Sequence, residues 1–398
     1  MAIIESTIAP SSDSFKTNRT GMLALISRMR GLEQRARAAS AAAKDRFHKR
    51  GQLLPRERVA LVLDPGSPFI ELSTLAGYMF DLPDADKSVP GGGLIAGIGF
   101  VSGVRCMVSA NDSGIDAGAL QPYGLDKTLR VQELALENKL PYVQLVESAG
   151  ANLLRYRVED FVRGGNIFRN LALLSAAGLP VVTVTHGSST AGGAYQTGLS
   201  DYIVMVRGRT RAFLAGPPLL KAATGEIATE EELGGAEMHT SISGLGDYLA
   251  EDDRDALRIA RDIMANLEWD RPSTGEASHR PPRHDPEELL GIMPMDHKRP
   301  VDMRQVIARI DHAVVEQAGA GRKHIHLAVE HGGDLRLHLV QLFSFDRLAT
   351  SDGGGLGHDR HGFGGLLAAH HRGFCVGPGE TEARMKTTAA HAVIAGAE

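Results

Sequence analysis

The chain has 398 residues, of which 43% are hydrophobic and 23% are charged, and its formal net charge is -5. This length is sufficient for one large or two medium domains, each with a substantial core. The near balance of charges and an aromatic share of only 5% argue against nucleic acid as a partner.

The two cysteines, Cys106 and Cys375, lie far apart and form no CxxC pair. Neither a disulfide framework nor a zinc ribbon is therefore indicated, and we expect no metal site. No apolar run reaches the ~18 residues that a membrane span requires, and the N-terminus has no apolar signal core. These features predict a cytoplasmic protein without membrane contact.

Residues 1–50 are predicted to form a basic helical region. Between residues 18 and 50 the chain is rich in Ala, Leu, Arg and Lys, and Met22, Leu25, Ile26 and Met29 recur at helical spacing. Such a helix can be a solvated surface, or its positive face can meet phosphate groups or a partner protein.

From about residue 94 to residue 250, short apolar runs alternate with helical patterns. The runs are LIAGIGFV, VRCMVS, YVQLV, VVTVT and IVMV, and the helical patterns cover 125–138 and 166–177. Buried β-branched strands joined by helices of this length predict an α/β fold, with a parallel or mixed sheet and helices packed outside it.

A change of composition follows this region. Residues 271–310 begin with six prolines among charged residues, which predicts a linker. The tail, residues 311–398, is rich in His and Gly and has weak periodicity, so it does not predict a well-packed domain. Its histidines, such as His324 with His326 and His370 with His371, are spaced too loosely to specify a metal site.

The segment HGSSTAGGAY, residues 186–195, directly follows the buried strand VVTVT and precedes a short helical continuation. Because Gly192 and Gly193 have no β-carbon, a carbonyl oxygen can approach their backbone N–H groups, and a helix N-terminus adds positive potential. These are the ingredients of an oxyanion hole. The alternative is that the glycines only permit a tight turn and close packing.

Two further segments have a related design. LVESAGANL, residues 145–153, again ends a buried strand in a turn of small residues with exposed amides, and two such turns suggest one shared pocket. GPPLLKAATGEIATEEELGGAEMH begins at Gly216, and its glycines bracket two short helices.

The N-terminal part of the chain resembles the carboxyltransferase (β) subunits of biotin-dependent acyl-CoA carboxylases. The resemblance rests on RGQLLPRERVALVLDPGSPFIELS (residues 50–73) and on the three segments above, and it covers residues 20 to 310 approximately. It extends through a predicted helix at 252–267 and the phrase ELLGIMPMDHKRPVDMRQVIARI. It implies a crotonase-like (ClpP/crotonase) superhelix of ββα units, with residues 51–270 as the acyl-CoA-binding domain.

The resemblance also implies roles for individual residues. Gly192, Gly193 and Ala194 would form the oxyanion hole for the thioester, and His186 would be structural rather than a general base. The substrate-binding residues would be Ser148, Ala149, Gly150, Ala151, Thr190, Ala191, Tyr195, Gly216, Pro217 and Pro218.

The implied reaction transfers CO2 from carboxybiotin to an acyl-CoA through an enolate that backbone amides stabilise. No ATP-binding loop is present, so ATP and bicarbonate would be used by a biotin carboxylase partner, with biotin carried on a biotin carboxyl carrier subunit. The family also implies a homo-oligomer. GPPLLKAATGE favours the methylcrotonyl-CoA and geranyl-CoA type, although SGIDAGALQPYG, after Asn111 and Asp112, departs from the methylcrotonyl pattern.

The C-terminal half of the family pattern, which would hold biotin, is absent after residue 310. Arg384 to Thr387 resembles a biotinylation site only by chance, since the second methionine is missing. A truncation or a reading-frame shift near residue 310 would explain the change, and translation of the other two frames tests this. Two alternatives to a carboxylase remain, a biotin-dependent acyl-CoA decarboxylase subunit and a catalytically inactive CoA-binding remnant.

Overall fold

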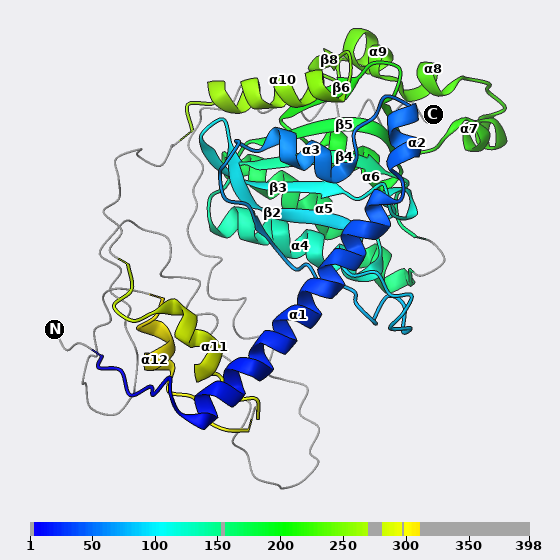
Figure 1. Ribbon diagram of the computed structural model, residues 1–398. Coiled ribbons are helices and arrows are strands. Elements are labelled where there is room, and N and C mark those ends of the chain that lie inside the picture. Colours follow the sequence, from blue (N-terminus) through cyan, green and yellow to red (C-terminus); the bar gives the residue numbers. More distant parts are fainter. Residues whose placement is uncertain (1–3, 153–155, 270–280, 297, 311–398) are drawn as a thin grey trace, which may run out of the picture.

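The computed structural model describes residues 4–152, 156–269, 281–296 and 298–310. The predictions for the tail, residues 311–398, and for the phrase near Lys386 lie outside the described residues. The described part is built around one mixed sheet with helices on both faces (Figure 1). The predicted α/β class is therefore confirmed.

The strands of this sheet run in the order β1-β2-β3-β4-β5-β6-β8, and β7 pairs with β5. β1, β2 and β3 are antiparallel neighbours, whereas β3, β4, β5, β6 and β8 are parallel. Their bounds are β1 (Ile70–Glu71), β2 (Leu94–Val101), β3 (Val104–Asn111), β4 (Tyr142–Ser148), β5 (Val181–Thr190), β6 (Tyr202–Val206), β7 (Arg211–Phe213) and β8 (Tyr248–Ala250).

The helices connect these strands and cover the sheet. They are α1 (Asp13–Ala41), α2 (Lys44–Lys49), α3 (Pro55–Val62), α4 (Pro122–Glu137), α5 (Val158–Ala176), α6 (Gly192–Gly198), α7 (Pro217–Thr224), α8 (Glu230–Gly234), α9 (Ala236–Met238), α10 (Asp253–Asn266), α11 (Leu289–Ile292) and α12 (Met303–Ile307). Short η helices lie at Asp116–Gly118, His239–Ser243 and Pro286–Glu288.

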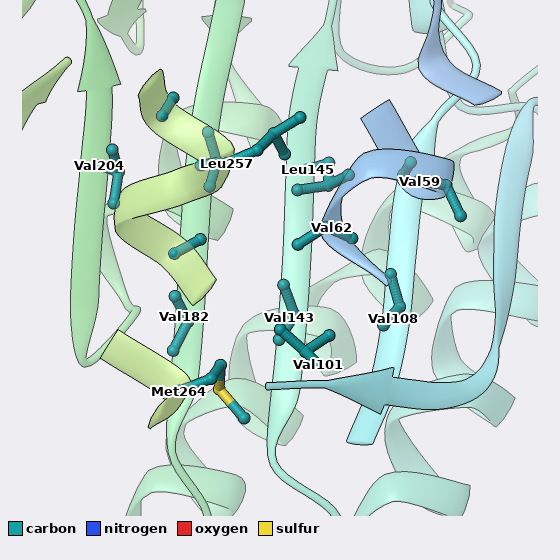
Figure 2. Close-up of a cluster of buried hydrophobic side chains, with 14 of the residues drawn as sticks. Val59, Val62, Val101, Val108, Val143, Leu145, Val182, Val204, Leu257 and Met264 are labelled. Carbon is teal, nitrogen blue, oxygen red and sulfur yellow. The ribbon is translucent and has the colours of Figure 1, made fainter. Parts of the chain in front are cut away.

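The central strands are apolar on both faces because each face is covered by helices. On one face, Val108, Val143 and Val182 pack beneath α3 and α10, together with Val62 and Leu257 (Figure 2). On the other face, the preceding residues of these strands, Met107, Tyr142 and Val181, pack in a second core cluster with residues of α4 and α5. Alternate residues of one strand therefore enter two different core layers.

The predicted helices are present, with some different bounds. α10 matches the helix predicted over 252–267, and α4 matches the one predicted over 125–138. α5 begins eight residues before the predicted start at 166, since the Arg157 N–H donates to the Asp160 carboxylate and caps the first turn. Apolar Val158 and Val162 are exposed there, so the apolar residues of this turn do not follow the one-sided spacing that predicts a helix.

The predicted N-terminal helix is two helices, α1 and α2, separated at Ala42 and Ala43. α1 runs from the sheet to a small unit that contains α11 and α12 (Figure 1). The later part of the predicted linker therefore packs against α1. Phe15 is nearly buried against Gly291, and Arg309, with 1% of its surface exposed, pairs with Glu288.

None of the described helices is long and apolar enough to cross a membrane.

Candidate active site

The two glycine-containing turns follow adjacent parallel strands, β4 and β5, at the same edge of the sheet. Ser148 at the end of β4 is in register with Ser189 of β5. A β-carbon built on Gly193 would lie 3.7 Å from Ser148 Cβ, and one built on Gly150 would lie 3.4 Å from the Thr190 carbonyl oxygen. The two turns therefore lie side by side, as the predicted shared pocket requires, and the pocket itself stays a prediction.

The turn after β5 leaves two backbone N–H groups without an acceptor among the described residues. Ala191 has φ 51° and ψ -119°, a conformation that costs on the order of 1–3 kcal/mol for a residue with a side chain. Its own N–H donates to the Phe213 carbonyl of β7 at 3.1 Å, which holds the turn in place. α6 begins immediately afterwards, and the N–H groups of Gly192 and Gly193 donate to no other described residue.

The two glycines differ in the space around them. A β-carbon on Gly193 would lie 3.3 Å from Ser189 Oγ, a tight contact that would require Ser189 to shift slightly. At Gly192 the nearest atom would be Cζ of Phe168 at 3.8 Å, an ordinary contact distance. Packing within the described protein therefore disfavours a side chain at Gly193 but not at Gly192.

The turn after β4 is more fully hydrogen-bonded than the sequence indicated. The Ala149 N–H donates to the Ala117 carbonyl at 3.2 Å, and the Gly150 N–H donates to Ser148 Oγ at 3.1 Å. The expectation of free amides is thus wrong for these two residues. The Ala151 N–H has no acceptor among the described residues and is the amide of this turn that remains open.

The segment that departs from the methylcrotonyl pattern lies against this same turn. Gly118 accepts a hydrogen bond from the Ser148 hydroxyl at 2.8 Å, and Ala117, with φ 52°, accepts the one from Ala149. A difference in this segment is therefore transmitted directly to the turn after β4.

The third predicted segment reaches the site through β7, which pairs with the end of β5. Gly216 is the N-cap of α7, and Pro217 and Pro218 occupy its first turn, where a proline needs no hydrogen-bonded N–H. Tyr195 of α6 faces Phe168 of α5, with ring centroids 4.6 Å apart. Of the predicted site residues, those half-buried are Ala151, Thr190, Gly192, Tyr195, Gly216 and Pro217, those exposed are Ala149, Ala191 and Pro218, and those buried are Ser148, Gly150, Gly193 and Ala194.

A buried charge cluster behind these turns was not predicted. Arg58 of α3 pairs with Glu147, the residue before Ser148, and through its Nε with Asp253 of α10 at 3.3 Å. Asp253 also accepts a hydrogen bond of 2.9 Å from Nδ1 of His186 and one of 2.7 Å from the Leu53 N–H. These residues are far apart in the sequence, so no local motif indicated the cluster.

His186 is completely buried, which agrees with the structural role expected for it. Burial, and next the positive charge of Arg58, lower the pKa of His186, although its bond to Asp253 acts in the opposite direction. Burial alone would raise the pKa of Asp253, but the hydrogen bond from His186 and the positive charge of Arg58 hold it well below its usual range. At neutral pH the cluster therefore holds a neutral imidazole beside an ionised carboxylate.

Both shifts predict that acid destabilises the fold. As the pH falls through about 6.5, the histidine binds a proton in the unfolded chain but not in the folded one, so stability decreases. The contribution of Asp253, complete above its unfolded pKa near 4, decreases further below that value. We expect the urea midpoint to fall steadily between pH 7.5 and pH 5. An unchanged or higher midpoint at pH 5 would contradict this.

Within the described ranges, no group of three or more His, Cys, Asp or Glu side chains is placed to hold a metal ion.

The mixed sheet, with small-residue turns at the ends of two adjacent parallel strands, defines a crotonase-like domain of the carboxyltransferase type. The chain belongs to the carboxyl transferase domain family, whose model matches residues 46–324.

Three similar proteins indicate which kind of carboxyltransferase this chain resembles. The chain is 51% identical, over 67% of its length, to a probable biotin-dependent acyl-coenzyme A carboxylase beta2 subunit of Mycobacterium tuberculosis, and covers 49% of that protein. It is 47% identical, over 67% of its length, to the biotin-dependent 3-methylcrotonyl-coenzyme A carboxylase beta1 subunit of the same organism, and covers 50% of it. The crystal structure of the geranyl-CoA carboxylase beta subunit of P. aeruginosa aligns with a TM-score of 0.71 and 52% identity, over 79% of this chain and 58% of that one.

The predicted resemblance to β subunits of the methylcrotonyl-CoA and geranyl-CoA type is therefore confirmed. The chain spans about half the length of the curated relatives it matches.

Proposed function

We propose that this chain supplies the acyl-CoA side of a carboxyltransferase, as part of a biotin-dependent acyl-CoA carboxylase of the methylcrotonyl-CoA or geranyl-CoA type. The observation that carries the proposal is the turn after β5. Two backbone N–H groups there have no acceptor among the described residues, and Gly192 is a glycine that packing does not require. A ligand oxygen that approaches these N–H groups accounts for both facts.

The proposed chemistry needs donors directed at an oxygen rather than an acid or a base from this chain. Removal of a proton from the acyl group places negative charge on the thioester oxygen, and the N–H groups of Gly192 and Gly193 stabilise that charge. The strained turn at Ala191 and its bond to Phe213 hold these donors in place before the substrate binds. Carboxybiotin, carried on a partner subunit, would supply the CO2 to which the enolate carbon bonds, and its freed ring nitrogen would accept the proton.

The remaining residues of the proposal surround this oxygen site. The Ala151 N–H is a further donor across from α6, and Ser148, Gly150 and Thr190 form the wall between the two turns. Gly216 and Pro217 begin α7 beside the end of β7, and Tyr195 with Phe168 offers aromatic surface for an acyl chain. The proposed partners are a biotin carboxylase and a biotin carboxyl carrier subunit, and we propose a homo-oligomer.

A second candidate is an acyl-CoA-binding protein without turnover. The donors of the proposed site are backbone N–H groups, which can bind a ligand oxygen without any catalytic side chain. This candidate shares the oxygen site and differs only in the absence of carboxylation.

The test is a titration of the full chain with 3-methylcrotonyl-CoA, geranyl-CoA, propionyl-CoA and acetyl-CoA by calorimetry, followed by incubation with the biotinylated partner, ATP and labelled bicarbonate. Transfer of label to 3-methylcrotonyl-CoA or geranyl-CoA supports the carboxylase. Binding of acyl-CoA without transfer supports the second candidate. If no acyl-CoA binds, both are refuted.

A further inference from the structure

A line of buried hydroxyl groups joins β5 to α6, behind the N–H groups of the proposed oxygen site. Thr197 Oγ1 of α6 lies 3.0 Å from Thr185 Oγ1 and 3.0 Å from Ser189 Oγ, both on β5. All three side chains are completely buried. Thr197 is thus the shared member of two hydrogen bonds between the strand and the helix.

These hydroxyl groups lie next to the proposed oxygen site at one end and are hydrogen-bonded to the sheet at the other. Ser189 Oγ is the atom nearest to the position of a β-carbon on Gly193, at 3.3 Å, so it lies directly behind that glycine. The Thr185 carbonyl accepts a hydrogen bond from the hydroxyl of Thr210, which is also fully buried and accepts one from the Val206 N–H. The hydroxyls therefore connect the site to the rigid parallel strands.

Apart from the Ala191 bond to Phe213 before it and the contact of Tyr195 with Phe168, α6 is held mainly by these hydroxyl groups. It has seven residues, three of which are glycines, so it presents little side-chain surface for packing. A short helix of this composition is not stable by itself. Because hydrogen bonds depend on distance and angle, two bonds to one hydroxyl restrict the rotation of the helix more closely than apolar contact does.

We propose that Thr197 is a positioning residue, whose hydroxyl holds α6 at the angle that directs the N–H groups of Gly192 and Gly193 toward the thioester oxygen. This inference rests on the proposed function and deepens it. Replacement of Thr197 by a residue of the same shape without the hydroxyl leaves the packing around α6 unchanged but lets the two N–H donors turn away from the oxygen. Polarisation of the thioester carbonyl therefore decreases more than the affinity for the acyl-CoA does.

Thr183, two residues before Thr185 on the same face of β5, offers a matched control. Thr183 Oγ1 is 2.6 Å from Ser200 Oγ, just beyond the C-terminal end of α6, and it also accepts a hydrogen bond from Gln144. Thr183→Val removes a buried hydroxyl of the same kind from the same strand. It does so at the end of α6 that is remote from Gly192.

The experiment uses the full chain and 3-methylcrotonyl-CoA labelled with 13C at the thioester carbonyl. We expect the carbonyl resonance to move downfield when the wild-type chain binds it, since hydrogen bonds to the oxygen draw electron density from the carbon. Thr197→Val is expected to lose most of this displacement while its dissociation constant changes little. Thr197→Ser, which restores the hydroxyl, and Thr183→Val are expected to keep it.

If Thr197→Val keeps the full downfield change of the carbonyl resonance, the inference is overturned and the proposed function is left intact. Equal loss in Thr183→Val also overturns it, because the effect would then be one of general packing. If the wild-type chain binds the ligand without any displacement, the proposed oxygen site itself fails. Should Thr197→Val not fold, Ser189→Ala removes one of the two bonds instead, and its displacement is expected to be reduced but not lost.

Discussion

Asp253→Ala is expected to lower the free energy of unfolding by about 3–5 kcal/mol, the loss typical of one partner removed from a buried ion cluster. The carboxylate has 1% of its residue surface exposed and is shared by Arg58, His186 and the Leu53 N–H. Without it, a guanidinium remains deep in the protein with Glu147 as its remaining anionic partner. Urea unfolding at pH 7.5, followed by circular dichroism, measures the loss.

The matched control is Asp262→Ala, on the same helix. Asp262 pairs with Arg258, and both side chains are about as exposed as in an ordinary surface pair, at 58% and 61%. Because solvent screens an exposed pair, we expect a much smaller loss of stability from this variant than from Asp253→Ala. If the two variants lose similar amounts of stability, the buried cluster around Asp253 does not stabilise the fold more than an exposed surface pair.

Gly192→Ala is expected to separate function from stability. The new methyl group meets no atom closer than 3.8 Å in the described protein, so the fold accepts it. Alanine also reduces the conformational freedom of the unfolded chain, which stabilises by about 0.4–1 kcal/mol where the conformation permits. The methyl group would nevertheless occupy the approach to the N–H groups, and loss of one oxyanion donor typically reduces the rate on the order of 10²- to 10³-fold.

The measurement pairs a urea titration with carboxylation of 3-methylcrotonyl-CoA, or with the carbonyl resonance of the bound ligand if the chain does not turn over. Gly31→Ala in α1 is the control, because a methyl group there also meets open space and α1 lies away from the turns. If Gly192→Ala keeps the wild-type carboxylation rate, or the wild-type change of the carbonyl resonance, Gly192 is needed only for the backbone turn and not for the ligand.

Much of the architecture could be predicted because it depends on neighbouring residues. Runs such as VVTVT alternate between two covered faces, and the turns of small residues follow directly where those runs end. The start of α5 could not be predicted, because Val158 and Val162 are exposed and show no amphipathic pattern. Its beginning depends instead on the cap made by Asp160.

The candidate site was predicted as a set of residues but not as a geometry. The sequence places Gly150 and Gly193 after two strands, yet only the parallel pairing of β4 with β5 brings them together. The hydrogen bond from the Ala149 N–H also depends on a loop about thirty residues earlier in the chain, at Ala117. Which amides remain open is therefore a property of the folded chain.

The sequence alone determined the alternation of strands and helices, the small-residue turns and the family, since each depends on residues that are close along the chain. Tertiary structure decided the rest. It joined Arg58, Glu147, His186 and Asp253 into one buried cluster and packed α11 against α1. It also left less space for a side chain at Gly193 than at Gly192. Such contacts join residues tens to hundreds of positions apart. These residues come together only when the helices pack on the two faces of the sheet.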